Sequence, residues 1–368
     1  HYRVVAQNDS GTTNGPDVAF NTAANFSISS SYSQHTVNVA SDGIVHAYGY
    51  NIYGQLGIGN NHSCSEPTPV LKGAYDGTTY LGDNPDNPIV AVSAGEFHTL
   101  ALAADGSVYG FGYNSGRQLG DSTTITRTTP IRVLKGAYGG TRYLGDSTGN
   151  PVVSIAAGLY HSLAVTLNGE VYAFGRGSSY QLGHGTTSTP FVPVKTLAGQ
   201  YENATYLGAD STNPILSVVA GDYHSLALAA DGSVYGFGQN NIYQLGNGTN
   251  STQTTPTKVH KGASDGKYYL GANPDNPVVG IAAGYRFSTA LTAKGEVYGF
   301  GENGYGRLGD GTTSARTTPV RAVKGAYAGP TYLGDAANNR VMAIANGYYH
   351  TLAVTEGGSV FGYGYGGH

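Results

Sequence analysis

Short segments in which apolar and polar residues alternate recur along the chain, separated by turns rich in Gly, Asn, Asp and Ser. Residues 89–94, 98–102 and 107–112 form three such segments, and an Asp-Gly pair at 105–106 separates the last two. Asp-Gly is typical of a two-residue type I′ hairpin turn, whose two positions both require a positive φ. A fourth segment, 130–134, begins with Pro, which suits an outer edge strand. The pattern predicts four short antiparallel strands and no amphipathic helix.

This four-segment pattern recurs with a fixed step of 63 residues. A motif of His or Phe followed by Ser or Thr marks each unit, and it begins at His35, His98, His161, His224, Phe287 and His350. Units of four short antiparallel strands repeated around an axis are the signature of a β-propeller. We therefore predict an all-β fold in which residues 26–368 form a single six-bladed β-propeller.

The two ends of the chain predict how the ring closes. The sixth unit has no counterpart of the fourth segment, whereas residues 1–25 precede the first unit and align in part with 68–79. An open sheet edge recruits further strands, so we expect the N-terminal segment to supply the missing strand, in cis or to a neighbouring molecule. The expected strand comprises Tyr2, Arg3, Val4, Val5, Ala6 and Gln7. Residues 1–22 also resemble the end of a fibronectin type III domain, and this alternative makes them part of an upstream domain.

The composition excludes several functions. Charged residues make up 11% of the chain, its net charge is −4, and it has no long apolar stretch. Nucleic-acid binding and polybasic membrane anchoring both need a basic surface, and a membrane-spanning helix needs roughly 20 apolar residues. The low charge, the abundant Ser, Thr, Asn and Tyr, and a first residue other than Met fit a secreted or cell-surface product. The number of Asn-x-Ser/Thr sequons is close to that expected by chance, but the Ser/Thr runs at 122–129 and 251–255 could carry O-glycans in a surface protein.

The cysteine and histidine content argues against a metal site. Cys64 is the only cysteine, so neither an internal disulfide nor the usual cysteine-histidine zinc site is available. Five of the six unit markers are histidines, and imidazole is a common metal ligand. Because the histidines recur inside a strand motif and Phe287 breaks the set, we interpret them as inter-blade hydrogen-bonding residues. We expect neither a metal nor a cofactor.

A second hairpin follows the fourth segment of each unit and carries tyrosines around a turn. The tyrosines expected to form a contact surface are Tyr75, Tyr80, Tyr138, Tyr143, Tyr201, Tyr206, Tyr269, Tyr327 and Tyr332. Aromatic residues are enriched at the centres of protein interfaces, so we predict that these hairpins line one rim and recognise a partner. In the alternative interpretation, each pair only caps its own hairpin.

No pattern in the sequence indicates catalysis. The loop between the first two strands varies between units and contains Glu96, Asp222 and Arg286, which the ring would bring to one face. No pair of carboxylates at hydrolase spacing, nucleophile elbow or phosphate loop is recognisable. We therefore predict a protein that is not an enzyme.

A specific repeat family is recognisable in these units. The residues that carry the resemblance are Gly95-x-x-His98-Thr99-Leu100-Ala101-Leu102, Asp105-Gly106-x-Val108-Tyr109-x-Phe111-Gly112-x-Asn114 and Gln118-Leu119-Gly120. They resemble the repeat of the regulator of chromosome condensation family, whose best-known member has seven blades. Phe or Tyr stands here where the family usually has Trp. The inserts with Tyr-Leu-Gly-Asp resemble those of large bacterial surface proteins, which implies a prokaryotic, extracellular origin.

Three functions remain open at this point. The first is a structural subunit that associates with itself in an extracellular filament, as the low charge, the tyrosine hairpins and the open strand edge suggest. The second is a module of a larger adhesin that binds a sugar or a protein. The third is exchange-factor-like regulation, which the resemblance alone suggests, because no residues here match the surfaces that such activity needs.

Overall fold

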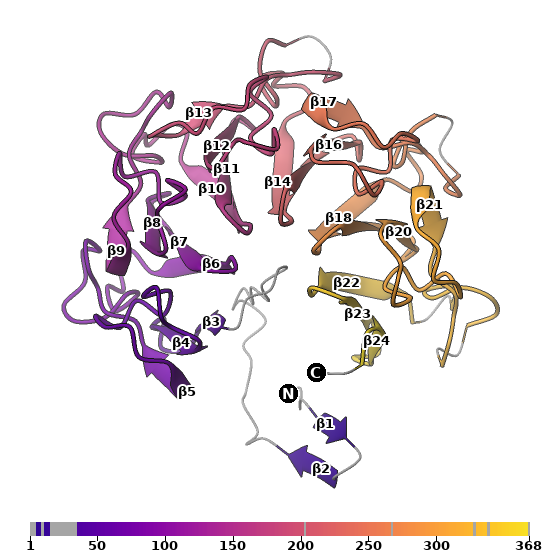
Figure 1. The fold of residues 1–368 in the computed structure, drawn as a ribbon, viewed down its shortest axis with the longest axis horizontal. Helices are drawn as coiled ribbons and strands as arrows, with labels where there is room; N and C mark the ends of the chain where they lie inside the picture. Colours follow the sequence, from indigo (N-terminus) through magenta and orange to yellow (C-terminus); the bar gives the residue numbers. More distant parts are fainter. Residues whose placement is uncertain are drawn as a thin grey trace.

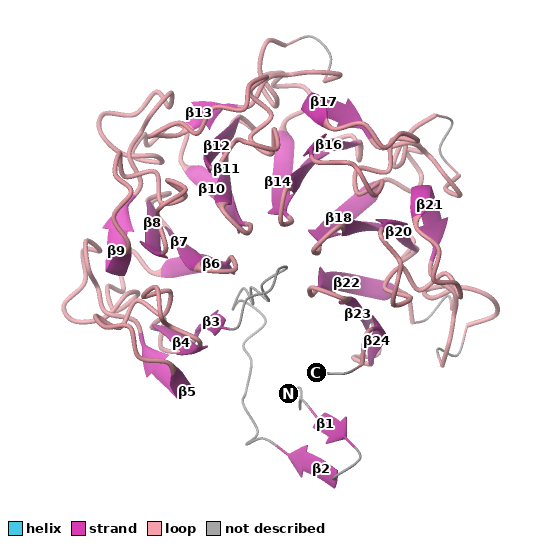
Figure 2. Cartoon of the chain, viewed as in Figure 1, coloured by secondary structure: helices cyan, strands magenta, loops and turns pink. Residues whose placement is uncertain are grey.

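The computed structural model describes residues 35–368, except 202–203, 266–267, 327–328, 337–338 and 367–368, and the backbone of two short strands near the N-terminus. The described residues form 24 strands and no helix. Six antiparallel sheets stand side by side around one axis, with their loops at the two faces and the periphery (Figures 1 and 2). The chain is therefore an all-β, six-bladed β-propeller, as the 63-residue step predicts.

Each blade is a meander whose strands follow the chain outward from the axis, and we call them A to D. Blade 1 contains B, C and D as β3 (His35–Val39), β4 (Val45–Gly49) and β5 (Cys64–Pro69). Blade 2 contains β6 (Ile89–Ala94), β7 (His98–Ala103), β8 (Val108–Gly112) and β9 (Arg127–Arg132). Blade 3 contains β10 (Val152–Ala157), β11 (His161–Thr166), β12 (Val171–Gly175) and β13 (Val194–Lys195).

The other three blades repeat this order. Blade 4 contains β14 (Ile215–Ala220), β15 (His224–Ala229), β16 (Val234–Gly238) and β17 (Gln253–Lys258). Blade 5 contains β18 (Val278–Ala283), β19 (Phe287–Thr292), β20 (Val297–Gly301) and β21 (Arg316–Arg321). Blade 6 contains A, B and C as β22 (Val341–Asn346), β23 (His350–Thr355) and β24 (Val360–Gly364).

A chain of side-chain hydrogen bonds, which we call the His–Ser relay, joins neighbouring blades. His98 Nε2 lies 2.8 Å from Ser162 Oγ of the next blade, and the Ser162 hydroxyl donates at 2.8 Å to the carbonyl of Gln118, in the blade of His98. A hydroxyl has one proton, so Ser162 accepts from His98, whose neutral ring carries its proton on Nε2. The other relays are His35–Thr99–Gln55, His161–Ser225–Gln181 and His224–Ser288–Gln244. The predicted inter-blade role is confirmed at these four histidines; His350 occupies the same place in blade 6 and is half-buried.

Aromatic rings fill the seams between blades. Phe174 of strand C is fully buried, and its ring lies against Gly120 of the preceding blade. A Cβ at Gly120 would lie 3.0 Å from that ring, and the residue has a φ of +59°, so a side chain would be both crowded and strained. The same contact recurs at four other seams as Gly57–Phe111, Gly183–Phe237, Gly246–Phe300 and Gly309–Tyr363. The glycine of the Gln-Leu-Gly motif is thus required by packing.

The tyrosine hairpins contain two different kinds of tyrosine. The first one is buried: Tyr75 is 2% exposed, its ring meets Tyr109 edge to face, and its hydroxyl donates to the Asn87 carbonyl at 2.5 Å. Tyr138 and Tyr201 repeat this arrangement at 3% exposure. These three tyrosines pack in the core, which corrects the expectation that they line a contact surface. A phenol with a backbone acceptor can be buried without losing a hydrogen bond.

The second tyrosine of each hairpin lies nearer the surface. Tyr206 and Tyr269 are each 37% exposed, and Tyr80, Tyr143 and Tyr332 are half-buried. A recognition role for these five stays a prediction, and Tyr327 lies outside the described residues. Each of the five also pairs with the residue nine positions earlier, as Leu71 with Tyr80, so each closes its own hairpin.

The N-terminal strands form a hairpin of their own. β1 (Val5–Asn8) pairs with β2 (Gly11–Asn14), and Val5 stands opposite Asn14. Among the described strands, β24 pairs with β23 alone, so the expected pairing of Val5, Ala6 and Gln7 with blade 6 is not present. The two strands are separated by only two residues, so their pairing costs little loop entropy. Residues 2–4 lie outside the described part, and closure of the ring by this segment stays a prediction.

The relay histidines predict how acid destabilises the fold. Complete burial lowers the pKa of His35, His98, His161 and His224 from 6.5 to about 3. Between these pH values the unfolded chain binds protons that the folded chain does not, so stability is complete above pH 6.5 and is lost as the pH falls. Each relay histidine adds about 1.4 kcal/mol per pH unit to this loss.

We expect His161→Phe to lower the free energy of unfolding at pH 7.5 by about 1–3 kcal/mol, because Ser225 loses a buried donor. The variant's disadvantage should shrink as the pH falls to 5, since one proton-binding difference has been removed. Urea unfolding at four pH values measures both effects, and His62→Phe, at an exposed loop position, is the control. A disadvantage that stays constant with pH would contradict the assignment of a buried neutral imidazole.

Closure by the N-terminal segment predicts that deletion of residues 1–10 lowers the Tm by several degrees, because β24 loses a pairing strand. A synthetic peptide of residues 1–14, added in excess, should restore part of the loss. An unchanged Tm and oligomeric state after the deletion would contradict closure and favour the fibronectin-like interpretation.

Candidate functional site

One face of the ring carries the loops that join strands A to B and C to D, and we call it the A–B face. The C–D loops are held by a buried asparagine: Asn114 Nδ2 donates to the carbonyls of Thr123 and Ile125, and its Oδ1 accepts from the Leu119 amide at 3.0 Å. Asn51, Asn240 and Asn303 hold the corresponding loops. Asn114 belongs to the repeated sequence motif, but the motif alone does not predict this role. The loops are therefore a fixed platform for the residues they present.

Two aromatic clusters lie on the A–B face. The first, in blades 1–3, comprises Tyr53, Phe97, Tyr113 and Tyr160, whose successive ring centroids are 4.7–6.1 Å apart. The second, in blades 5 and 6, comprises Tyr285, Tyr305, Tyr348, Tyr349 and Tyr365. Tyr285 and Tyr348 stack at 4.2 Å with an angle of 17° between their planes. Tyr305 and Tyr365 are 49% and 41% exposed, so the clusters reach the surface. The repeat pattern alone does not predict these clusters, because each cluster joins residues of different blades.

The three variable charged residues of the A–B loops do influence one another. Burial raises the pKa of the Asp222 carboxyl well above its usual value, the charge of Glu96 raises it further, and the charge of Arg286 lowers it. Burial also raises the pKa of Glu96, to about 7. The ring thus brings together residues from blades 2, 4 and 5, as the sequence predicted. Their loops follow strands A, which are the innermost strands around the ring axis (Figure 1), and we call this group the channel mouth.

Blade 5 departs from the relay at two positions. Phe287 replaces the relay histidine, and Arg307 replaces the glutamine of the other blades. Arg307 is fully buried, with its guanidinium 5.6 Å from the Phe287 ring and 4.8 Å from the Tyr349 ring, and it pairs with Glu302 at 3.5 Å. The two replacements are complementary, because the face of an aromatic ring attracts a cation whereas a buried imidazole beside Arg307 would not. Blade 5 therefore uses a cation–π contact where blades 1 to 4 use the histidine, whereas the Thr351 hydroxyl still donates to the Arg307 carbonyl at 2.9 Å.

The inner strands expose a set of apolar side chains. At the second position of strands A the structure exposes Val90, Val153, Leu216, Val279 and Met342, each by 38–55%. The pairing of strands A and B shifts its register at every one of these residues. Such a bulge re-aims one side chain away from the sheet. The innermost strands therefore present apolar side chains around the axis, a feature that simple alternation does not predict.

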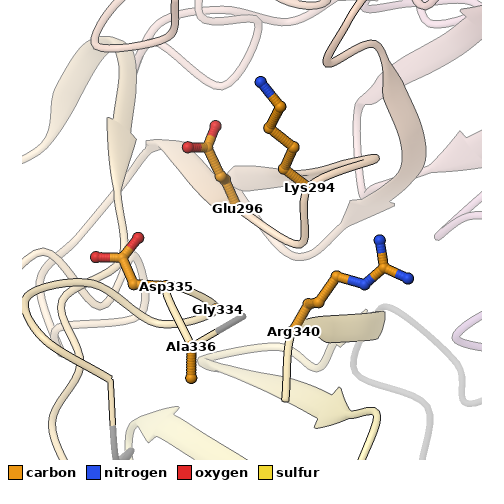
Figure 3. A pocket seen from close by; sticks show the side chains of 6 residues that line it. All are labelled: Lys294, Glu296, Gly334, Asp335, Ala336 and Arg340. Atoms are coloured by element: carbon orange, nitrogen blue, oxygen red, sulfur yellow. The ribbon is translucent and has the colours of Figure 1, made fainter. Parts of the chain in front are cut away.

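A shallow pocket of about 280 Å³ lies between blades 5 and 6 near the loops that join strands B to C. Figure 3 shows its lining by Lys294, Glu296, Gly334, Asp335, Ala336 and Arg340. Arg321 pairs with both Glu296 and Asp335, at 3.2 and 2.6 Å, so both acidic groups already have a cation. The pocket is therefore a poorer candidate than the A–B face.

The described residues contain neither a metal-binding cluster nor a membrane-spanning helix. In that part of the chain, no group of three or more His, Cys, Asp or Glu side chains is placed to hold a metal ion. The same residues contain no helix long and apolar enough to cross a membrane.

Comparison with known proteins places this architecture in a family. A family described as the RCC1-like domain matches residues 33–368. The ultraviolet-B receptor UVR8 of Arabidopsis thaliana is 30% identical over 341 residues, which cover 92% of this chain and 64% of the receptor. The human E3 ubiquitin-protein ligase HERC2 is 31% identical over 326 residues, which cover 89% of this chain and 6% of the ligase. The chain thus spans less than two thirds of the length of these relatives.

Solved structures show the same fold. Human WBSCR16 superposes with a TM-score of 0.72 at 24% identity, covering 96% of this chain and 78% of that protein. Yeast RCC1 (Prp20), solved bound to Kap60, superposes with a TM-score of 0.68 at 19% identity, covering 93% of this chain and 69% of the yeast chain. The repeated blades thus define a β-propeller of the RCC1 type. This chain belongs to the family of RCC1-like domains.

The paired replacements in blade 5, Phe287 for histidine and Arg307 for glutamine, can be tested with a double-mutant cycle. Phe287→His and Arg307→Gln should each destabilise the fold by about 1–3 kcal/mol, because each leaves one half of the cation–π contact. The double variant restores the residues of the relay and should be more stable than the sum of the single effects predicts. Chemical unfolding of the four proteins measures this coupling, and strictly additive effects would contradict the proposed complementarity.

Proposed function

We propose that this chain is a non-catalytic propeller that binds another protein through its A–B face. The observation that carries the proposal is the contrast between two sets of residues. The relay histidines and the seam aromatics recur from blade to blade and serve the scaffold. The charged residues of the channel mouth do not recur in other blades, and the aromatic trio Tyr53, Phe97 and Tyr113 recurs at only one other seam, as Tyr305, Tyr349 and Tyr365, although the same kind of loop presents these positions in every blade.

The chemistry of this face suits protein binding. Tyrosine offers a large ring and a polar hydroxyl at low cost in conformational entropy, and aromatic side chains and arginine are enriched at interface hot spots. The rings here already contact one another, so binding a partner would cost little further side-chain entropy. Yeast RCC1 (Prp20) supports the same class of function, because that protein is known bound to Kap60 and it binds Gsp1p and histones.

A second candidate is self-association outside the cell. It is supported by the low charge of the chain and by the outer edge of β24, which has no partner strand among the described residues. Exposed edges recruit strands from other molecules, so each subunit would receive a strand from a neighbour. In this proposal the protein lies at the cell surface of a prokaryote. Binding of a sugar and glycosylation of the chain are further proposals for that location. Exchange-factor-like regulation is the third candidate.

Site-specific photo-crosslinking distinguishes these candidates. A photoreactive phenylalanine placed at Tyr113, Tyr305 or Tyr365 should crosslink to another protein in the source cells, because these positions belong to the A–B face clusters. Tyr80, Tyr206 and Tyr332 are the matched controls, since these tyrosines lie in the hairpins that follow strand D and therefore away from the A–B face. Mass spectrometry of the crosslinked species identifies a foreign protein, a small GTPase or a second copy of the chain.

Crosslinks confined to the hairpin positions would overturn the assignment of the A–B face and restore the tyrosine hairpins as the recognition surface. Crosslinks from the A–B face only to further copies of the chain would replace the proposal with self-association. Fractionation of the same cells tests the proposed location independently.

A further inference from the structure

The channel mouth contains a buried carboxylate that the described part of the protein does not satisfy. Asp222 is 2% exposed, and its Oδ1 has no hydrogen-bond partner among the described residues. Burying a charged group without a partner costs several kcal/mol, and most buried polar groups in folded proteins are paired. No other A–B loop has an acidic residue at the position of Asp222 except blade 2, where it is Glu96. The repeat therefore does not require this carboxylate for the fold.

The nearby arginines do not neutralise the site. Arg286 lies close enough to lower the pKa of Asp222, yet no ion pair within 4 Å joins them among the described residues, and Arg286 Nε has no hydrogen-bond partner there. The Arg286 guanidinium instead lies over the ring of Tyr285 at 4.6 Å. Glu96 adds a second negative charge that acts on Asp222. Arg176, the second arginine near these residues, lies over the ring of Tyr160 at 5.5 Å, and among the described residues neither arginine forms an ion pair with the two acidic groups.

The surrounding side chains are aromatic. The charge of Asp222 acts on Tyr223 and Tyr348, and the charge of Glu96 acts on Tyr160 and Tyr223. The faces of tyrosine rings attract cations, and the attraction is stronger where water is excluded. Carboxylates among aromatic rings therefore favour a ligand that carries a positive charge and several N–H donors. A metal ion is less well matched, because no group of three or more His, Cys, Asp or Glu side chains is placed to hold one in this part of the chain.

We propose that Asp222 and Glu96 form a subsite at the channel mouth that receives one lysine or arginine side chain of a partner protein. This inference rests on the proposed function of the A–B face and names the chemistry of its partner. A long basic side chain fits this subsite, because its aliphatic stem can pack along the tyrosine rings while its charged end reaches the buried carboxylate. The incoming N–H groups would pair with the Asp222 carboxylate that the fold leaves unsatisfied.

The subsite can be tested without knowing the partner, using n-butylammonium chloride as the probe for the lysine side chain. At pH 8 and constant ionic strength, tens of millimolar probe should raise the Tm of the wild-type chain by about 2 °C relative to sodium chloride. Asp222→Asn should abolish this rise. Asp231→Asn, at an exposed turn of the same blade, should retain it. n-Butanol at the same concentration controls for the alkyl chain.

The probe-free proteins provide a second, independent readout. Asp222→Asn should keep or raise the Tm, because it removes the cost of an unsatisfied buried charge. A fall in Tm together with an unchanged response to n-butylammonium would show that Asp222 supports the fold and would overturn the proposal. A probe response equal in wild type and Asp222→Asn would do the same.

The outcome is separable from that of the proposed function. Absence of crosslinked partners from the A–B face would refute protein binding there, yet it would leave the response to n-butylammonium intact. If crosslinking succeeds but n-butylammonium raises the Tm of wild type and Asp222→Asn equally, the face binds a partner but does not receive a basic side chain at this position.

Discussion

The hydrogen bond between a histidine of one blade and a hydroxyl of the next is the interaction on which the rest of this structure depends. It fixes the position of each blade relative to the next, because the hydroxyl that accepts from the histidine also donates to a backbone carbonyl of the histidine's own blade. The geometry requires a neutral imidazole with its proton on Nε2, which burial enforces by lowering the pKa to about 3. Four seams use this arrangement, and the glycine–aromatic contact beside it fixes how closely two blades approach.

A scaffold held by repeated residues leaves other positions free to differ. The loops of the A–B face have conserved geometry within the ring, because a buried asparagine holds four of the C–D loops. The residues presented there differ between blades: a buried acid and an arginine occur once each, and aromatic clusters form at only some of the seams. Blade 5 shows that even a relay position can change when its neighbour changes with it, since Arg307 and Phe287 replace glutamine and histidine together.

The periodic part of the structure could be predicted from the sequence because it is repeated. Six occurrences of one motif at a constant step define the blades, their strands and the role of His98 and its equivalents. The sequence also placed Glu96, Asp222 and Arg286 on one face. It could not separate Tyr75 from Tyr80, because burial depends on a hydrogen bond to the Asn87 carbonyl twelve residues away. It likewise missed the exposed side chain of Val90, whose bulge follows from pairing register, and the tyrosine clusters, which join residues of different blades.

The division between scaffold and recognition residues is tested most directly by a saturation mutagenesis scan read out by protease resistance. The account predicts that His98, Ser162 and Gly120 tolerate almost no substitution, whereas Asp222, Glu96 and Tyr305 tolerate most and some changes at Asp222 increase resistance. Equal intolerance at the two sets of positions would contradict it, because the residues of the A–B face would then be needed for folding.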